Sequence, residues 1–327
     1  MLSAEGEKPQ FIMLPKFPQF KKLEITDKAD IEEITLQYPP YSDFNFVSLW
    51  VWDIKNAIRI SQLNGNLLVK FSDYLSEESF YSFLGREKTN ETAEALLELS
   101  KKEKIRPVLK LVPENSVVKM DQNKFNIIEE RNHFDYIYSI KNLAAYVGSE
   151  YKKHRKNTRR FKEIHKFEVK FMNLTEEKNK KILQDLVDLW TKKKKDKIDN
   201  TKNYKELEDF KNESIAFKKL LSSPDDFLKS LICFSIFIED KLASFIVSER
   251  IMDDYCLSHF GKSNIGYEGI SQFLMQSHAK FFLDMGIDYH NDEQDLGLPN
   301  LRFSKNSYRP AHFLKKYSIA YLDDFVI

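Results

Sequence analysis

The spacing of apolar residues alternates between a strand period of two and a helical period near 3.6 along the chain. In the first 150 residues the clearest feature is Asn64-Gly65, which stands between two short apolar runs. Asn-Gly in this position favours a two-residue turn, so we expect a β-hairpin there. The surrounding patterns predict these elements: strand 23–26, helix 27–37, helix 41–52, hairpin strands 57–62 and 66–71, strand 80–84, helix 91–103, strand 107–112, helix 124–131 and strand 136–140.

The second half of the chain repeats this order loosely. Its patterns predict helix 151–163, strand 167–173, helix 177–194, a polar loop at 196–205, helix 207–221, hairpin strands 231–239 and 242–250, strand 255–260, helix 270–285 and strand 288–290. The halves share no residue-level repeat, so the similarity indicates a duplication of the fold. We therefore expect a mixed α/β protein with an N-terminal arm at 1–20, a first unit at 21–145 and a second at 146–327.

Composition and charge exclude several classes of protein. Hydrophobic residues make up 42% and charged residues 31% of the chain, which is typical of a globular protein. The net charge is +1, so affinity for nucleic acid or an anionic surface has to come from a local patch. Cys233 and Cys256 have no metal-type spacing and indicate neither a zinc site nor a disulfide framework. Without a signal peptide or an apolar run of about 20 residues, we expect a cytoplasmic protein with no transmembrane segment.

A turn at 264–269 lies between a predicted strand and a predicted helix. Gly266 and Gly269 let the backbone approach a ligand closely, and the N-terminus of the following helix offers free N–H groups to an anion. This arrangement suits a pyrophosphate or the phosphate of an acyl carrier. The alternative is that the glycines only make a tight turn.

A polar segment at 291–310 follows a short, apolar strand. Its charged residues are Asp292, Glu293, Asp295, Arg302, Lys305 and Arg309. If the segment folds back on itself, carboxylates and cations shift the pKa values of one another, as at many functional sites. The alternative is an ion-pair network that only fixes the last strand pairing.

Seven of the eleven residues in 152–162 are Lys or Arg. On a helix, such a stripe could contact the phosphates of RNA, of an anionic lipid surface or of a nucleotide, or it could be a solvated charged face. The histidines His259, His278 and His290 are scattered along the sequence, and we interpret them as core or rim residues.

Taken together, these segments resemble the bacterial family that shares the C-terminal domain of phosphatidylglycerol lysyltransferase. The resemblance spans about residues 25–320. The matching residues are Tyr41–Phe46 with Trp52, Arg155–Phe161, Glu213, Ala216, Lys262, Ser263, Tyr267, Gly269, Asn291, Glu293, Asp295, Leu296, Gly297, Leu301, Arg302, Lys305, Ser307, Tyr308 and Pro310. The fold that the resemblance implies is two tandem acetyltransferase-like (GNAT-like) domains, and the family's relatives transfer an aminoacyl group from charged tRNA to a lipid or a peptidoglycan precursor.

The resemblance and the residues together predict an acyl- or aminoacyl-transferase without a tightly bound cofactor or a metal. Aminoacyl-tRNA or acyl-CoA is the expected co-substrate, and an amine or hydroxyl of a lipid, peptide or small molecule is the acceptor. The residues expected to be catalytic are Glu293 and Asp295, which orient or deprotonate the acceptor, and Arg302 and Lys305, which neutralise negative charge. Those expected to hold the donor are Lys262, Gly266, Tyr267 and Gly269.

The residues expected to grip RNA backbone are Lys152, Arg155, Lys156, Arg159 and Arg160. Two alternatives remain at this point. One is a non-catalytic protein that binds RNA or a partner on a duplicated GNAT-like fold. The other is an enzyme that uses the same basic stripe to sit on an anionic lipid surface.

Overall fold

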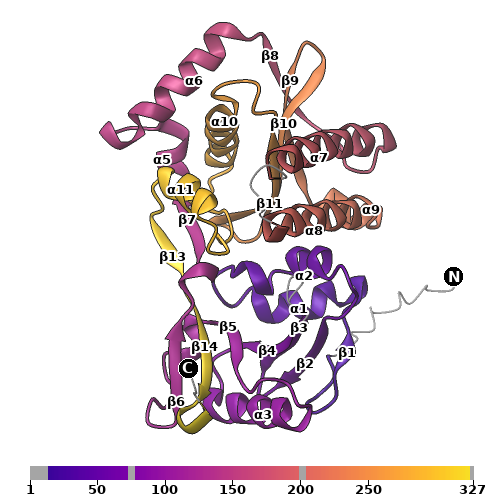
Figure 1. The fold of residues 1–327 in the computed structure, drawn as a ribbon, viewed down its shortest axis with the longest axis vertical. Helices are drawn as coiled ribbons and strands as arrows, with labels where there is room; N and C mark the ends of the chain where they lie inside the picture. The colour runs from indigo at the N-terminus through magenta and orange to yellow at the C-terminus, as the bar shows by residue number, and fades with distance from the viewer. Residues whose placement is uncertain (1–13, 73–77, 199–203, 325–327) are drawn as a thin grey trace, which may run out of the picture.

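The computed structural model describes residues 14–72, 78–198 and 204–324, which form a mixed α/β protein with three β-sheets (Figure 1). The first sheet has the order β1-β2-β3-β4 and contains the hairpin expected at Asn64-Gly65, where Leu63 pairs with Asn66. Its strands are β1 (Lys21–Lys22), β2 (Arg59–Leu63), β3 (Asn66–Ser72) and β4 (Ser79–Leu84). Residues 1–13 of the expected arm lie outside the described residues. Leu14 is buried, and the N–H of Phe17 donates to the Gln62 carbonyl, so the described end of the arm packs on this sheet.

A second, three-stranded sheet has the order β5-β14-β6 and joins the two ends of the chain. Its strands are β5 (Leu109–Pro113), β6 (Phe125–Glu129) and β14 (Lys316–Tyr321). The prediction of a helix at 124–131 is therefore wrong. Residues 125–129 are extended because they pair with a strand almost 200 residues further along the chain, a partner that local periodicity cannot reveal. The helix α3 (Thr89–Lys102) covers these sheets with Leu96 and Leu97.

The largest sheet has seven strands among the described residues, in the order β13-β7-β12-β11-β10-β9-β8. These are β7 (Asp135–Ser139), β8 (Phe167–Phe171), β9 (Ile232–Ile238), β10 (Lys241–Arg250), β11 (Tyr255–Ser263), β12 (Tyr289–Asn291) and β13 (His312–Leu314). The pairings are antiparallel except for β11 with β12, which is parallel. Both cysteines are buried and free, in β9 and β11.

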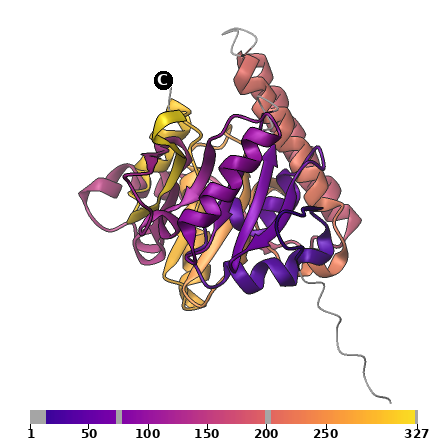
Figure 2. The same cartoon turned by 90° about the horizontal axis from the view of Figure 1, so that it is seen from below.

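Helices cover both faces of this sheet, because its strands carry apolar residues on both sides. Ile246 of β10 packs with Phe273 of α10 on one face, whereas its neighbour Phe245 stacks on Phe217 of α8 on the other. The helices of the first face are α10 (Ile270–Asp284) and α6 (Lys152–Ile164), and those of the second are α7 (Glu177–Ile198) and α8 (Tyr204–Leu221). Figure 2 shows the α7–α8 pair projecting beyond the body of the sheets.

The strands β11 and β12 diverge. Their pairing ends at Leu257 and Asn291, although β11 continues to Ser263. In β11, His259 is an extra residue, because Val247 pairs with Phe260 and Ser248 with Ser258. Such a β-bulge redirects side chains and bends the strand. The chain thus has an opening between two strands, with a histidine at its edge.

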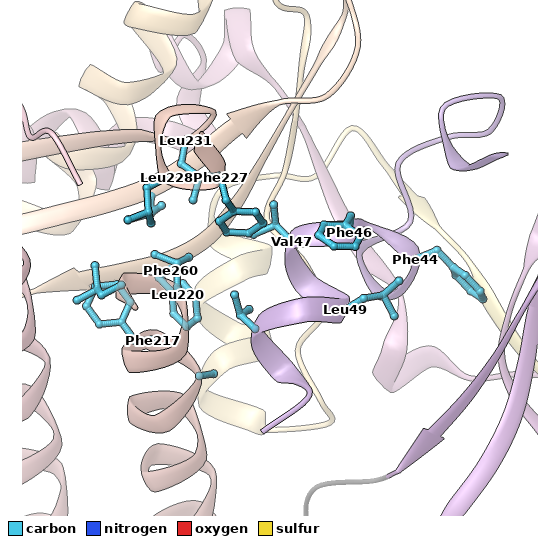
Figure 3. Packing of buried hydrophobic residues seen from close by; sticks show 14 of the residues in the cluster. Phe44, Phe46, Val47, Leu49, Phe217, Leu220, Phe227, Leu228, Leu231 and Phe260 are labelled. Atoms are coloured by element: carbon cyan, nitrogen blue, oxygen red, sulfur yellow. The ribbon is translucent and has the colours of Figure 1, made fainter. Parts of the chain in front are cut away.

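One hydrophobic core runs through both halves of the chain. Figure 3 shows Phe46, Val47 and Leu49 of α2 (Phe46–Trp52) packed against α8 and α9 (Asp225–Lys229). The strand pairings also connect the halves, since β7 precedes the boundary expected at 145/146 but belongs to the large sheet, and β14 follows it but belongs to the small one. The two expected units are thus joined by shared strands and a shared core.

Candidate active site

The N-terminus of α2 lies in the opening between β11 and β12, and its polar side chains face the large sheet. Asn45 is the N-cap, because its Oδ1 accepts a hydrogen bond from the N–H of Ser48 at 3.0 Å. The same side chain donates through Nδ2 to Glu249 Oε1 at 2.6 Å. The apolar residues that follow Asn45 enter the shared core, which fixes the capping turn against the strands.

Four side chains form a hydrogen-bonded row across the opening. His259 lies 3.0 Å from Glu249 (Nε2 to Oε1) and 3.3 Å from Ser48 (Nδ1 to Oγ). The Ser48 hydroxyl is also 3.3 Å from Oε1 of Glu293. The Ser48 hydroxyl has one proton, and it can donate that proton either to His259 or to Glu293. When it donates to Nδ1 of His259, the Ser48 oxygen can accept a hydrogen bond from a neutral Glu293 carboxyl. The row can therefore hold a proton at either end.

Glu293 is the most electrostatically perturbed carboxyl of this row. Its pKa is raised to about 8: burial is the largest cause, Lys305 opposes the rise, and nearby Asp135, Asp292 and Asp43 add to it. Its backbone is left-handed, with φ 56°, and is held by two hydrogen bonds: its N–H donates to Asn291 Oδ1, and its carbonyl accepts from the N–H of Tyr136. A carboxyl group with a pKa near neutrality is suited to proton transfer, and unusual backbone often accompanies such sites.

Lys305 lies near Glu293 and belongs to α11 (Pro299–Ser307), a helix within the polar segment 291–310, for which the sequence analysis predicted no helix. Pro299 at the first turn starts this helix, as proline does where no N–H partner is needed. The ammonium group is nearly buried and donates to the carbonyl and, at 3.0 Å, to the carboxylate of Asp292. The helix thus holds one cation at the carboxyl end of β12.

Asp295 has a different environment from Glu293. Arg302 binds both of its oxygens (Nε to Oδ2 2.9 Å, NH2 to Oδ1 2.8 Å), and Tyr136 donates to Oδ2 at 2.6 Å. Arg131 and the N–H of Gly297 add two further donors. Burial would raise the pKa of Asp295, but the bonds from Arg302 and Tyr136 outweigh it and hold the pKa below its ordinary value. With its oxygens occupied, this carboxylate suits positioning of the loop better than proton transfer.

The segment that leads into α2 docks against the loop after β12. Asn291 donates to the Pro40 carbonyl at 2.7 Å, and Gln294 donates to Asp43 at 3.2 Å. Behind them, the buried Lys316 and Asp135 pair at 2.8 Å. The two blocks of the family resemblance that lie 250 residues apart, 41–46 and 291–297, are therefore in direct contact.

The turn at 264–269 is separate from this row. Gly269 has φ 86°, and a Cβ there would lie 2.3 Å from the Asn157 carbonyl of α6, so the glycine serves helix packing. Tyr267 packs edge-on against His165. The N–H of Gly266 donates to Asn264 Oδ1 at 3.1 Å, and a Cβ at Gly266 would lie 3.2 Å from the same oxygen. Lys262 does not face this turn. Its ammonium donates to Glu213 of α8 at 2.5 Å and lies over the ring of Trp190.

The basic residues lie on α6, which buries only His154, Thr158 and Phe161. Arg155 donates to the carbonyls of Tyr146 and Gly148 and thereby ties down the preceding loop. The other expected RNA-binding residues are exposed: Arg159 pairs with Glu163, Arg160 pairs with Glu268, and Lys152 and Lys156 have no ion pair within the described ranges.

The sequence analysis missed Asn45, Ser48, Glu249 and His259 as members of a site. Asn45 belongs to a block of the resemblance, but the other three carry no local motif. Ser48 and His259 are 211 residues apart in sequence and meet only through the docking of α2.

In residues 14–72, 78–198 and 204–324, no group of three or more His, Cys, Asp or Glu side chains is arranged to hold a metal ion. Within those ranges, no helix is both long and apolar enough to cross a bilayer.

Comparison with protein families places this arrangement in a known group. The family described as phosphatidylglycerol lysyltransferase, C-terminal, matches residues 37–320. The chain therefore belongs to this family. No curated protein sequence matches it.

Solved structures share the fold. A protein of unknown function from Bacteroides thetaiotaomicron is 22% identical, with a TM-score of 0.75 over 94% of this chain and 100% of that one. The C-terminal domain of a protein named as a lysylphosphatidylglycerol synthetase from Agrobacterium fabrum is 10% identical, with a TM-score of 0.60 over 89% and 91%. L-PGS from Bacillus licheniformis is 11% identical, with a TM-score of 0.59 over 92% of each chain. The expected mixed α/β fold class is confirmed.

Proposed function

We propose that this member of the phosphatidylglycerol lysyltransferase C-terminal family transfers an aminoacyl or acyl group, with the reaction centred on Glu293. The observation that carries the proposal is the hydrogen-bonded row Glu249–His259–Ser48–Glu293 at the divergence of β11 and β12, in which all members but the partly buried Glu293 are buried. It supplies a proton acceptor of near-neutral pKa together with an adjacent cation, Lys305. Acyl transfer needs both.

In the proposed reaction, the hydroxyl or amine of the acceptor attacks the carbonyl carbon of the donor ester or thioester. A new acceptor–carbon bond forms as the acceptor proton passes to Glu293, and Lys305 stabilises the negative oxygen of the tetrahedral intermediate. The intermediate collapses with cleavage of the bond to the leaving group. That oxygen or sulfur takes the proton from Glu293, which returns to its starting state.

We propose aminoacyl-tRNA as the donor in preference to acyl-CoA. The support is the stripe of exposed cations on α6, of which Lys152 and Lys156 are free of ion pairs within the described ranges. RNA backbone binds such stripes, and the binding weakens as the salt concentration rises, because the release of counterions from the RNA is then less favourable. The packing role of Gly269 argues against the turn at 264–269 as a pyrophosphate site. Charged tRNA also places the proposed activity in the cytoplasm.

The family description suggests which substrates to test first, lysyl-tRNA as donor and phosphatidylglycerol vesicles as acceptor. The assay follows radiolabel from charged tRNA into lipid and, in parallel, into added small amines. We expect transfer by the wild type and at least a hundredfold loss in Glu293→Gln. Glu91→Gln, an exposed residue of α3, should retain full activity.

Two results would contradict the proposal: consumption of no acyl donor by the wild type, or equal rates in the wild type and Glu293→Gln. In the first case the exposed α6 cations favour the second candidate function, non-catalytic binding of RNA. That function predicts salt-sensitive tRNA binding that does not distinguish charged from uncharged tRNA. The double variant Lys152→Glu/Lys156→Glu should then weaken the binding, whereas Lys102→Glu/Lys119→Glu, on exposed residues elsewhere, should not.

A further inference from the structure

A cleft of about 170 Å³ lies at the seam between the two halves of the chain. It is bordered by α1 (Lys28–Thr35), the start of α2, the end of α9 and the end of β10. Its walls include the apolar side chains of Leu36, Phe46 and Ile251 and the carboxylate of Glu249. The cleft thus touches the end of the hydrogen-bonded row that is farthest from Glu293.

Glu249 presents one carboxylate oxygen without a partner. The residue is only 5% exposed, and both of its hydrogen bonds, from Asn45 and with His259, use Oε1. No described residue donates to Oε2, although Glu249 lines the cleft. Oε2 is not among the buried atoms that lack a partner, so it is reached by solvent at the cleft, where an incoming donor can replace water on a charged acceptor.

The other charges around the cleft are already paired. Lys28 pairs with Glu32 one turn along α1, and Arg250 pairs with Asp253 at 2.8 Å. Lys28 is also near enough to help lower the pKa of Glu249. Of the two acids that line the cleft, Glu249 is the buried one, and its Oε2 has no donor among the described residues. A cationic donor satisfies both the charge and the open hydrogen-bond position, whereas an anion would meet the carboxylate directly.

We propose that this cleft binds a primary ammonium group through Oε2 of Glu249. The volume of the cleft is large enough for a small alkylammonium, because a protein cavity of about 150 Å³ holds a molecule as large as benzene. The apolar walls suit the short aliphatic chain that carries the amine. If the proposed function holds, the ammonium belongs either to the transferred aminoacyl group or to an amine acceptor. This choice of substrate is the only part of the inference that rests on the proposed function.

Binding is tested on the full chain with n-butylammonium as the probe, by ligand-observed NMR and titration of chemical shifts. n-Butanol and butyrate, which have the same chain length, serve as neutral and anionic comparisons. We expect the ammonium to bind at least tenfold more tightly than either, and Glu249→Gln to weaken its binding at least tenfold. Glu91→Gln, far from the cleft, should leave it unchanged.

A second variant guards against misfolding of Glu249→Gln. Thr35→Trp, at the end of α1, fills the cleft and keeps Glu249, so it should also abolish binding. Equal affinity for butanol and butylammonium, or ammonium binding that survives both variants, would overturn the proposal.

The two proposals fail separately. Ammonium binding without aminoacyl transfer would contradict the proposed function and support the ammonium site. Aminoacyl transfer without ammonium binding would support the proposed function and contradict the ammonium site. Displacement of butylammonium by charged but not uncharged tRNA assigns the amine to the donor. Lack of displacement by either assigns it to the acceptor.

Discussion

Two carboxyl groups of one loop, Glu293 and Asp295, differ in what surrounds them. Glu293 is partly buried near other acids, and its pKa rises to about 8, mainly through desolvation. Asp295 accepts bonds from two arginines, a tyrosine and a backbone N–H, and its pKa falls. Opposite shifts in neighbouring acids often separate a proton-transfer role from a structural one. We therefore propose that Glu293 and Lys305 are the catalytic members of the expected set and that Asp295 and Arg302 position the loop.

Replacement of Glu293 by glutamine should change how stability depends on pH. Because the pKa in the folded state is about 8 against an ordinary value of 4.5, the folded protein holds this proton more tightly than the unfolded chain. The resulting stabilisation is complete below about pH 4.5 and is lost as the pH rises to about 8. The wild type loses this stabilisation as the pH rises from 5 to 8, whereas glutamine does not titrate. The unfolding free energy of Glu293→Gln should therefore increase relative to that of the wild type over this range. Urea titrations at three pH values measure this. A constant difference, like the one expected for Glu91→Gln, would disprove the shift.

Replacement of Asp295 by asparagine should act on stability. The change leaves Arg302 and Arg131 without their carboxylate, although both arginines are partly exposed and water compensates in part. We expect a loss of about 2–4 kcal/mol in unfolding free energy. Chemical denaturation measures it, with Asp226→Asn on the surface as the control. A loss below about 0.5 kcal/mol would show that these ion pairs contribute little to the stability of the fold.

At the scale of elements, a close backbone contact between α6 and the start of α10 explains one glycine of the expected donor turn. Gly269 has a left-handed backbone, and a Cβ there would lie 2.3 Å from the Asn157 carbonyl of α6. A side chain there is strained twice, by its φ and by the clash. The same crossing fixes the position of the basic face of α6, so the turn and the basic stripe form one structural unit.

Gly269→Ala should therefore displace α6. We expect a loss of about 2–3 kcal/mol in unfolding free energy. Hydrogen exchange should rise in α6 before it rises in the sheet. Gly286→Ala is the matched control, because it shares the left-handed backbone but has nothing within 4 Å of a Cβ. Equal losses in both variants would mean that backbone strain alone, and not helix packing, explains the effect.

At the scale of the whole molecule, the two halves share strands, a core and the candidate site. Phe46 is fully buried at the seam and meets Phe227 edge-on, with ring centroids 6.3 Å apart. The row of site residues also crosses the seam, since Ser48 comes from the first half and Glu249, His259 and Glu293 from the second. The first half thus completes the site as well as supporting it.

The chain should accordingly unfold in one transition. Phe46→Ala removes a large core side chain and should cost about 3–5 kcal/mol. The loss should register equally in the fluorescence of Trp50, Trp52 and Trp190, which sample both halves, and in far-UV circular dichroism. Phe303→Ala, at an exposed position, should change little. Two separated transitions would show that the halves are independent.

Local sequence determined most of the elements, because helical and strand periods and the Asn-Gly turn act over a few residues. It also indicated the loop at 291–297 and the α6 stripe, whose charges are contiguous in the chain. Tertiary structure decided the rest. Residues 125–129 became a strand through a distant partner, Lys262 turned toward Glu213, and Gly269 met α6. The row from Glu249 to Glu293 formed because α2 inserts between two diverging strands. Such a site depends on contacts between residues more than 200 positions apart, which no local pattern encodes.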